Sequence, residues 1–501
     1  MATPISTESA LHRGTNWWGA FVIGLAGTIL VTGIAPVAVQ GLGAASIPLF
    51  VVITGIGVLL CFCLAELAAM MPHRTGGLPS YAFETFQPLG PRVAKHAGGI
   101  SGWAYWLGWF PVAPINMILA SAYIIQLFKI PTGTSYTLLG SVSSPISIAA
   151  LIISFVGLMV MFVPCYFGIK LGAIFATVLG VVSMAPLTAL VFLPVFHPSS
   201  AHLGNLSGFH LPPGVNGSVP FFASWIFVMT WSVLAMEAAA CYIGECRDPE
   251  RDAKIAMTAE GIFGFFIFVM IPVTLVAVLG VAKNADPLTV FTTYTSRVFS
   301  STSGSWVDYV IGIPLIVALL LSVLNAIMGC GRSLYQIAED GLLPRWFHHL
   351  NEHRVPDRAM FFNLVCSAIV VLFGSPLRIY IFSNMGYLLA CGMALGGYFV
   401  HRQFRPELPR PVRMPGWMRW PALASFIFFM IIWAYGGWNA PKLVVGPNES
   451  SFLFFLGLVV IAAYIPLYHW RQAADRRTGQ ALTPERAEPE DVDGPVVKNA
   501  E

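Results

Sequence analysis

The amino-acid sequence predicts an all-α polytopic membrane protein, and three observations lead to this prediction. Of the 501 residues, 56% are hydrophobic and 10% are charged, whereas a soluble domain carries about 25% charged residues. Uncharged runs long enough to cross a bilayer, which takes roughly 20 residues, recur along the chain. Lys and Arg gather in alternate connections between these runs, as expected when one set of connections is cytoplasmic.

Apolar runs between charged or Pro/Gly-rich breaks define twelve predicted transmembrane helices. We number them spans 1 to 12, and they lie at about 17–41, 46–71, 99–128, 146–164, 168–194, 220–244, 260–282, 306–335, 359–374, 379–400, 420–437 and 452–469. The first run is far longer than the apolar core of a signal peptide, which has about 7–15 residues, so we interpret it as a retained span.

This span count divides the basic residues unevenly. If both termini are cytoplasmic, 22 of the 27 Lys and Arg residues fall in cytoplasmic segments. The five others are Lys129, Lys283, Arg297, Arg378 and Lys442. An error of one span would mix the two groups, so the partition supports both the count and the orientation. We therefore expect a multi-pass protein of the plasma membrane, surrounded by lipid, with both termini in the cytoplasm.

Span 1 contains the stretch GTILVTGIAP, from Gly27 to Pro36, near its midpoint. Glycine, β-branched residues and proline all weaken a helix. Irregular backbone at membrane depth survives only where protein buries it or where it lines a cavity. The stretch therefore indicates either an interrupted helix or a seam of small residues for close helix packing. Span 1 alone leaves both interpretations open.

Four further stretches lie at the ends of other spans. They are CLAELAAMMPHRTGGLPSYAFETFQPLGP (63–91), WSVLAMEAAACYIGECRDPERDAKIAM (231–257), LNAIMGCGRSLYQIAEDGLLPRWF (324–347) and RPELPRPVRMPGW (405–417). Together with GTILVTG they resemble the amino acid–polyamine–organocation permeases over roughly residues 17–470. The resemblance implies the leucine-transporter fold, in which spans 1–5 and 6–10 are inverted repeats and helices 1 and 6 are interrupted beside the substrate.

The resemblance also divides the chain into parts. It implies a cytoplasmic segment at 1–16, an inverted-repeat transporter core of ten spans at 17–402, and two accessory spans at 403–470. The residues after these spans, 471–501, mix charges with Pro, Gly and Ala. Because such a composition buries little apolar surface, we expect a disordered cytoplasmic tail.

The stretch GTILVTG resembles the glycine-rich opening of this superfamily. The match implies that Val31, Thr32 and Gly33 are unwound. Backbone amides around Val31–Ile34 would then receive the substrate carboxylate at the positive end of a half-helix. Val31 stands where the family has a glycine, so we expect a narrower pocket.

The same resemblance places a second interruption at 231–234 in span 6, ahead of Glu237. It implies that Trp231 and Ser232 line the substrate site and that Trp231 closes this site from outside. The alternative for Trp231 is an ordinary packed aromatic residue. Ala235 replaces a glycine that related exchangers have here, so composition alone would not indicate a break.

Residues at the same depth in other spans complete the expected site. The resemblance points to Ala113 of span 3, to Asn325 and Ala326 of span 8, and to Ser383 or Asn384 of span 10. Each polar residue in this set has an alternative role as a hydrogen-bonding residue between helices.

Ionisable residues inside a membrane are costly and are usually functional. Glu66 of span 2 and Arg332 of span 8 lie toward the cytoplasmic ends of their spans, where they could form an ion-pair gate. The alternatives are a structural pair, or side chains that reach the interface. Glu237 could neutralise half-helix ends, carry a proton or hold an amino group of the substrate, and structural support is its alternative role.

Span 5 bears on the coupling ion. Some proton-coupled members of the superfamily have a lysine three residues before the late proline of this span, and Ser183 occupies that position here. A lysine-based proton mechanism is therefore not expected. Three mechanisms stay open: exchange against a counter-substrate, sodium coupling through Ser183 and span 8 hydroxyls, and proton coupling through Glu237.

The function expected from the resemblance is secondary active transport of amino acids by alternating access, as a permease or exchanger. One alternative is transport of polyamines or other organic cations, and another is a substrate receptor without turnover. We expect no enzymatic activity, cofactor, metal ion or nucleic-acid partner. His349 and His353 are four residues apart in HHLNEH, but no third zinc ligand is evident beside them.

Overall fold

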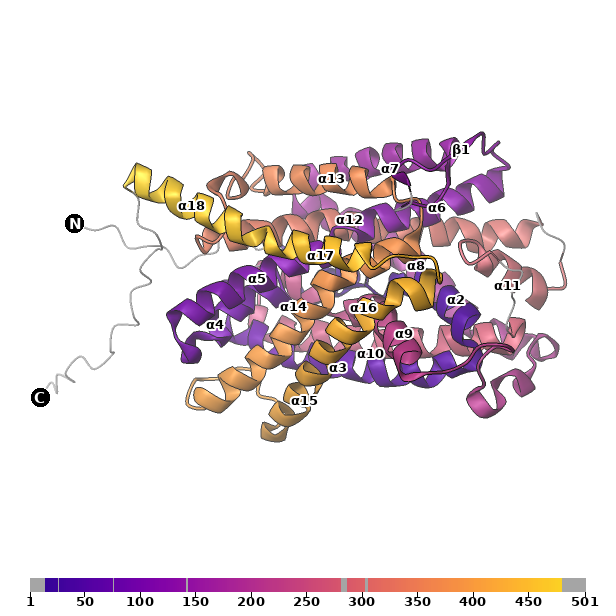
Figure 1. Cartoon of the computed structure of the whole chain (residues 1–501), viewed down its shortest axis with the longest axis horizontal. Helices are drawn as coiled ribbons and strands as arrows, with labels where there is room; N and C mark the ends of the chain where they lie inside the picture. Colours follow the sequence, from indigo (N-terminus) through magenta and orange to yellow (C-terminus); the bar gives the residue numbers. More distant parts are fainter. Residues whose placement is uncertain are drawn as a thin grey trace, which may run out of the picture.

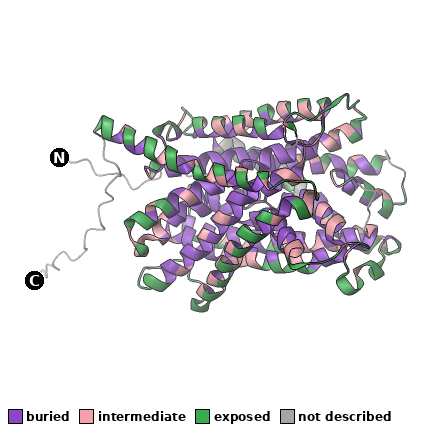
Figure 2. Ribbon diagram, in the orientation of Figure 1, coloured by how far each residue is buried: buried purple, intermediate pink, exposed green. Residues whose placement is uncertain are grey.

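The structure, a computed structural model, describes residues 14–25, 27–74, 76–140, 143–280, 286–301 and 305–479. It is a bundle of long helices, many of which run along the longest dimension of the molecule (Figure 1). Buried residues fill the centre of the bundle and exposed residues lie along its outside (Figure 2). A short antiparallel pair of strands, β1 (Ser135–Tyr136) and β2 (Ile146–Ser147), lies between the helices α6 (Val112–Phe128) and α7 (Ile148–Tyr166).

The described residues of the first half of the chain form α-helices and 3₁₀-helical segments, and the latter carry the label η. They are α1 (Trp17–Gly24), η1 (Thr28–Leu30), α2 (Val31–Leu42), η2 (Gly43–Ala45), α3 (Ser46–Met70), η3 (Leu78–Tyr81), α4 (Ala82–Thr85), η4 (Gln87–Leu89), α5 (Pro91–Trp109), α6 (Val112–Phe128), α7 (Ile148–Tyr166), α8 (Ile169–Phe196), η6 (Pro198–Ser200) and η7 (Leu203–Phe209).

The second half begins with the helix that follows a long connection at 210–218. Its elements are α9 (Val219–Val233), η8 (Leu234–Glu245), α10 (Pro249–Leu279), α11 (Val290–Val298), α12 (Trp306–Glu339), η9 (Arg345–Phe347), α13 (Asp357–Val371), α14 (Pro376–Phe404), η10 (Gly416–Met418), α15 (Arg419–Ile431), the π-helical η11 (Ile432–Gly436), α16 (Gly437–Ala440), the π-helical η12 (Pro441–Val445), α17 (Phe452–Ala462) and α18 (Tyr464–Thr478).

The outer surface of the bundle is apolar. Within the described residues, nine helical segments are long and apolar enough to cross a membrane. Four residues of α7 follow one another at helical spacing and are 54–59% exposed: Ile152, Val156, Val160 and Val163. An apolar stripe of this kind is incompatible with water and is ordinary in lipid. The chain is therefore a helical multi-pass membrane protein, as the sequence predicts.

Helices that correspond to spans five apart in the predicted order pack against one another. The pairs are α1 with η8, α3 with α10, α6 with α12, and α7 with α13. In the numbering of predicted spans these are spans 1 and 6, 2 and 7, 3 and 8, and 4 and 9. The centre of the bundle therefore lies between two sets of helices that meet pair by pair.

The expectation of a disordered tail from residue 471 is wrong for its first eight residues, which complete α18. The Arg471 guanidinium donates to the carbonyl oxygens of Ala338 (2.9 Å) and Leu343 (2.8 Å), which lie at and after the end of α12. It also pairs with Asp475 (2.6 Å), which is fully buried and pairs with Arg345 (2.8 Å). Composition predicts that the charged side chains here are exposed to water, whereas in the structure Asp475 pairs with Arg345 and Arg471. Residues 480–501 lie outside the described part.

Candidate functional site

The interruption of span 1 lies one turn earlier than expected. Helix α1 ends at Gly24, the tight turn η1 covers Thr28–Leu30, and Val31 begins α2. The amides of the turn are paired, since Thr28 N donates to Leu25 O (3.0 Å) and Leu30 N to Gly27 O (3.2 Å). Val31, Thr32, Gly33 and Ile34 are thus the buried first turn of α2 and not an unwound segment.

The interruption of span 6 begins at Leu234, the last residue of the expected segment 231–234, and continues much further along the chain. Helix α9 ends at Val233, and η8 continues from Leu234 to Glu245 as twelve residues of 3₁₀-helix. Runs of this type longer than three or four residues are uncommon, and within a helix they often mark a functional hinge. Trp231 and Ser232 lie in the last turn of α9 and are buried.

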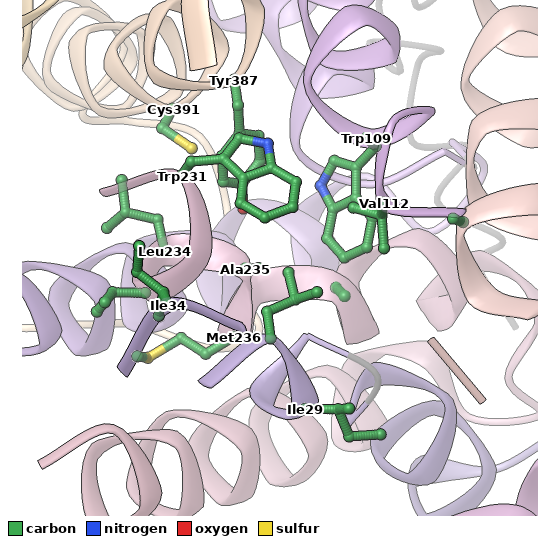
Figure 3. Packing of buried hydrophobic residues seen from close by; sticks show 14 of the residues in the cluster. Ile29, Ile34, Trp109, Val112, Trp231, Leu234, Ala235, Met236, Tyr387 and Cys391 are labelled. Atoms are coloured by element: carbon green, nitrogen blue, oxygen red, sulfur yellow. The ribbon is translucent and has the colours of Figure 1, made fainter. Parts of the chain in front are cut away.

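The two interruptions touch each other at the centre of the molecule. Gly27 lies against the carbonyl group of Ala235, and a Cβ atom at Gly27 would overlap the oxygen of that group. The close approach explains both the position of the break in span 1 and its glycine, because only a residue without a side chain fits there. Trp231 Nε1 donates to the carbonyl oxygen of Gly108 (2.9 Å), the neighbour of Trp109, and Figure 3 shows both tryptophan side chains in this region together with Ala235.

Glu237 lies within this central region on η8. Its side chain is fully buried, and its Oε1 atom accepts hydrogen bonds from Tyr105 Oη (3.1 Å), Trp109 Nε1 (3.2 Å) and Tyr387 Oη (2.9 Å). Its Oε2 atom has no hydrogen-bond partner among the described residues. Three neutral donors on one oxygen stabilise a carboxylate, while the second oxygen can accept a hydrogen bond from a ligand.

A narrow gap, with no room for a water molecule as the side chains stand, lies beside Tyr105 and Trp109, two of the donors to this carboxylate. Its lining residues are Tyr105, Trp109, Ala238, Cys241, Asn325 and Gly329. Asn325 Oδ1 accepts from the Tyr242 hydroxyl (2.5 Å), and Asn325 Nδ2 has no partner among the described residues. The Ser232 hydroxyl is also buried without one. The groups around this gap are therefore a carboxylate oxygen, an amide donor and aromatic rings, which would bind a small polar molecule only after the gap opened.

Span 10 contributes a tyrosine that sequence reasoning missed. The Tyr380 ring lies 4.7 Å from the Trp231 ring, and the Tyr380 hydroxyl occupies the place where a side chain at Gly33 would begin. Ser383, the expected residue of this span, instead donates to the carbonyl oxygen of Ile379 (2.8 Å) within its own helix. Tyr380 thus lies against both Gly33 and Trp231, whereas the Ser383 hydroxyl forms its hydrogen bond within its own helix.

The second candidate in span 10 and the candidate in span 3 also have packing roles. Asn384 Nδ2 donates to Phe227 O and to Thr230 Oγ1 (3.1 Å), which joins α14 to α9. Ala113 is fully buried in the first turn of α6, after a break at Phe110 and Pro111 that the sequence analysis did not predict. Pro111 lacks a backbone N–H, which accounts for the end of α5 at that point.

The aromatic residues around Glu237 and Trp231 were also missed, although the sequence carries a signal for them. Tyr105 and Trp109 are four residues apart on α5, and Tyr380 and Tyr387 are seven apart on α14. Both spacings place the members of a pair on one helix face. Aromatic residues at helical spacing in a membrane span are usually packing residues, so this signal alone did not indicate a site.

Glu66 and Arg332 do not pair with each other. Glu66 of α3 is fully buried and pairs with Arg402 of α14 and with Arg410 (2.9 Å) in the connection that follows. Arg332 of α12 instead pairs with Glu245, the last residue of η8, and both side chains are buried. Both pairs lie near the end of the bundle where α18 packs. The two residues thus belong to separate polar clusters.

Two further expectations concern ions. Ser183 lies in α8, and its side chain is outside the described part of the structure. His349 Nδ1 is 2.6 Å from Asp357 Oδ1. Across the described ranges, no group of three or more His, Cys, Asp and Glu residues could hold a metal ion.

Comparisons with known proteins agree on one kind of relative. The family model for amino acid permeases matches residues 16–463. The D-serine/D-alanine/glycine transporter of Escherichia coli K12 is 23% identical over 72% of this chain and 76% of its own length. The glutamate/gamma-aminobutyrate antiporter of Lactococcus lactis IL1403 is 24% identical over 81% of this chain and 80% of its own. The vacuolar cationic amino acid transporter 2 of Arabidopsis thaliana is 27% identical over 46% and 36%.

Proposed function

This chain belongs to the amino acid permease family, within the amino acid–polyamine–organocation superfamily, and from that premise we propose that it is a secondary active transporter of amino acids. Its family and relatives are transporters and not enzymes. The observation that carries the proposal is the contact between the two interrupted helices at Gly27 and Ala235, beside a buried carboxylate, Glu237, with one open oxygen. Interrupted helices that meet at mid-depth form the substrate sites of transporters with inverted repeats.

The proposed architecture has twelve crossings of the plasma membrane, a five-plus-five inverted repeat and two accessory spans. The packing of spans 1 to 4 against spans 6 to 9 supports the repeat, because two units related by a two-fold axis would meet in this way. The clusters of Arg402, Arg410 and Arg332 at the α18 end support cytoplasmic termini, since basic residues concentrate on that side of a membrane. Alternating access would open the centre first to one side and then to the other.

The proposed substrate lies between the start of α2 and Glu237. The positive end of the α2 dipole, around Val31–Ile34, attracts the carboxylate, and Glu237 Oε2 accepts a hydrogen bond from the ammonium group. The amides at the start of α2 can bind the carboxylate only after the η1 turn at Thr28–Leu30 opens. This turn is a single short 3₁₀ segment, a type with poorer hydrogen-bond geometry than an α-helix. Trp231, Ser232 and Asn325 complete the site in this proposal. The proposed substrate is a small amino acid, such as those named for the relative from Escherichia coli, and its binding requires the gap beside Tyr105 and Trp109 to open.

Counterflow in proteoliposomes tests the proposal. The purified chain is reconstituted, each of the twenty amino acids is loaded inside, and entry of the labelled form of the same amino acid is followed with and without sodium and a pH gradient. We expect saturable exchange for a small set of amino acids and its loss in Glu237→Gln. Absence of saturable exchange, with the folded protein confirmed by size-exclusion chromatography, would contradict the proposal.

Two parallel measurements separate the alternatives. Putrescine and spermidine in the same counterflow assay test transport of organic cations, which would require further acidic groups to balance several positive charges. Thermal stabilisation by an amino acid that gives no counterflow would instead indicate a receptor without turnover. Exchange that needs neither sodium nor a pH gradient would identify an exchanger.

A further inference from the structure

Glu260 is a buried carboxyl group that the site above does not use. It lies on α10 and is fully buried. Its Oε2 atom accepts a hydrogen bond from the amide of Ala239 in η8 (2.9 Å), and the amide of Ala238 lies close to the same carboxyl. Its Oε1 atom has no hydrogen-bond partner among the described residues. A Cβ atom on Gly24, the last residue of α1, would be 2.5 Å from Oε1.

The surroundings of Glu260 disfavour a negative charge. None of the ion pairs between described residues includes it. The titratable groups that act on it are Glu237 and Cys241 of η8 and Cys61 of α3. From α1 it meets the C-terminal end of a helix, which carries partial negative charge. An ionised Glu260 would thus be a buried charge without a counter-ion among the described residues, next to another acid.

The other buried glutamates have arginine partners or several side-chain hydrogen-bond donors, and Glu260 has neither among the described residues. Glu66 has two arginine partners, Glu245 has one, and Glu237 accepts hydrogen bonds from three side chains. Where two interacting acids bind a single proton, the proton resides mainly on the acid whose charged form is less stabilised. Between Glu237 and Glu260, that acid is Glu260.

We propose that Glu260 is a proton-binding site that couples transport to proton movement, an inference that rests on the proposed function. The carboxyl binds one proton at Oε1 while α10, α1 and η8 pack as they do here. When η8 moves away from α10, the Ala239 amide leaves Oε2, water reaches the carboxyl, and the proton is released to the side that is then open. One proton enters from one side and leaves on the other, and no electrons move.

The link to η8 makes this site suitable for coupling. The carboxyl contacts η8 at Ala239, two residues after Glu237 in the proposed substrate site. A change in the path of η8 on substrate binding would therefore change the surroundings of Glu260 directly. Conversely, loss of the proton would place a second negative charge beside Glu237 and favour separation of α10 from η8.

Thermal unfolding of the purified full chain between pH 5 and pH 9, about two units on either side of neutrality, tests proton binding without any substrate. Glu260→Gln reproduces the shape of the neutral acid, so it should fold. The wild type should lose stability as the pH rises and Glu260 ionises, and Glu260→Gln should lack that part of the loss. Glu250→Gln is the matched control, because Glu250 is an exposed residue on the same helix and should leave the wild-type profile in place. Identical pH profiles for wild type and Glu260→Gln, or failure of Glu260→Gln to fold, would overturn the proposal.

Infrared difference spectra between acid and alkaline pH give a second readout. The wild type should show a carbonyl band of a protonated carboxylic acid that is missing in Glu260→Gln and present in Glu250→Gln. A band that persists in Glu260→Gln would assign the proton to another acid and overturn the proposal.

Transport separates this proposal from the proposed function. With the amino acids that give counterflow in the wild type, an inward proton gradient should drive accumulation, and Glu260→Gln should lose this accumulation to a greater extent than it loses counterflow. If the wild type shows counterflow and proton-driven accumulation, and Glu260→Gln keeps that accumulation, Glu260 is rejected as the proton-binding site. The proposed transport function would still stand. Accumulation driven by sodium and insensitive to the proton gradient would also reject it. No counterflow in the wild type would reject the transporter itself, and the thermal and infrared measurements would still decide proton binding.

Discussion

Gly27 packs directly on the carbonyl group of Ala235, so that the two interrupted helices of this protein touch through their backbones. The backbone of Gly27 is in the right-handed helical region, with φ −68° and ψ −41°. Alanine can adopt this conformation without strain. Any effect of a side chain at this position therefore comes from the lost space and not from the backbone angles of residue 27.

Gly27→Ala should destabilise the protein by at least about 1–3 kcal/mol, the usual cost of overpacking, because the atoms that a new methyl group meets are backbone and cannot turn away. Thermal unfolding of the purified protein measures the loss. Gly55→Ala is the matched control: Gly55 lies on α3 with no atom within 4 Å of a new Cβ, and should be neutral or slightly stabilised. Equal melting temperatures for Gly27→Ala and the wild type would contradict the observed contact.

Gly33→Ala should impair substrate binding, because the new methyl group would overlap the Tyr380 hydroxyl. Tyr380→Phe removes that hydroxyl, and the nearest ring carbon would then lie 3.4 Å from the methyl group. The double variant should therefore recover much of what Gly33→Ala loses, which gives a coupling energy of about 0.5–3 kcal/mol in a double-mutant cycle. Counterflow rates and melting temperatures for the four proteins provide the cycle. Simple additivity would show that the two residues do not share this space.

Glu66→Gln should destabilise the protein by about 3–5 kcal/mol, because it leaves buried arginines without their counter-charge. The loss includes the hydrogen bonds that Glu66 accepts from Arg410 and from the amide of Met414 (2.8 Å). Glu352→Gln provides the comparison, since the Glu352 side chain is 79% exposed and its contact with His353 is 3.5 Å. That change should stay within about 0.5 kcal/mol of the wild type. Chemical or thermal unfolding in detergent checks both values.

Asp475→Asn should weaken the attachment of α18 to the end of α12. Asp475 is fully buried between Arg345 and Arg471, and loss of a buried charge of this kind costs about 3–5 kcal/mol. Arg477→Gln, an exposed change on the same helix, should have little effect. Limited proteolysis would show α18 becoming accessible in Asp475→Asn and not in Arg477→Gln. Protection of α18 in both variants would contradict a role for the buried charges.

Apolar patterning predicted where the chain is helical, because uncharged runs of span length have one stable solution in lipid. The break in span 6 could be anticipated by resemblance to the family, but not its extension as η8 to Glu245. In span 1, the motif placed the break at Val31, whereas the contact of Gly27 with Ala235 sets it earlier. That contact joins residues more than two hundred positions apart, so no local pattern reports it.

The partners and surroundings of the buried charged residues were the part of the structure that the sequence predicted least well. Glu66 and Arg332 lie at similar depths in their spans, yet their partners come from different segments. Glu66 pairs with Arg402 at the end of α14 and with Arg410 after it, and Arg332 pairs with Glu245 of η8. Glu260 falls at the predicted beginning of span 7, where an acidic residue looks like an interfacial boundary. Only the start of α10 at Pro249, about three helical turns earlier, places Glu260 inside the bundle.

The 3₁₀ form of η8 allows this segment to shorten if it rewinds as α-helix. A 3₁₀-helix rises about 2.0 Å per residue and an α-helix about 1.5 Å. The twelve residues Leu234–Glu245 therefore extend about 6 Å further than they would as α-helix, close to one α-helical turn. Rewinding this segment would draw Glu245 toward the centre, and Arg332 with it through their ion pair. A shift of that size in α12 could be generated by local rewinding alone, without rotation of a whole domain.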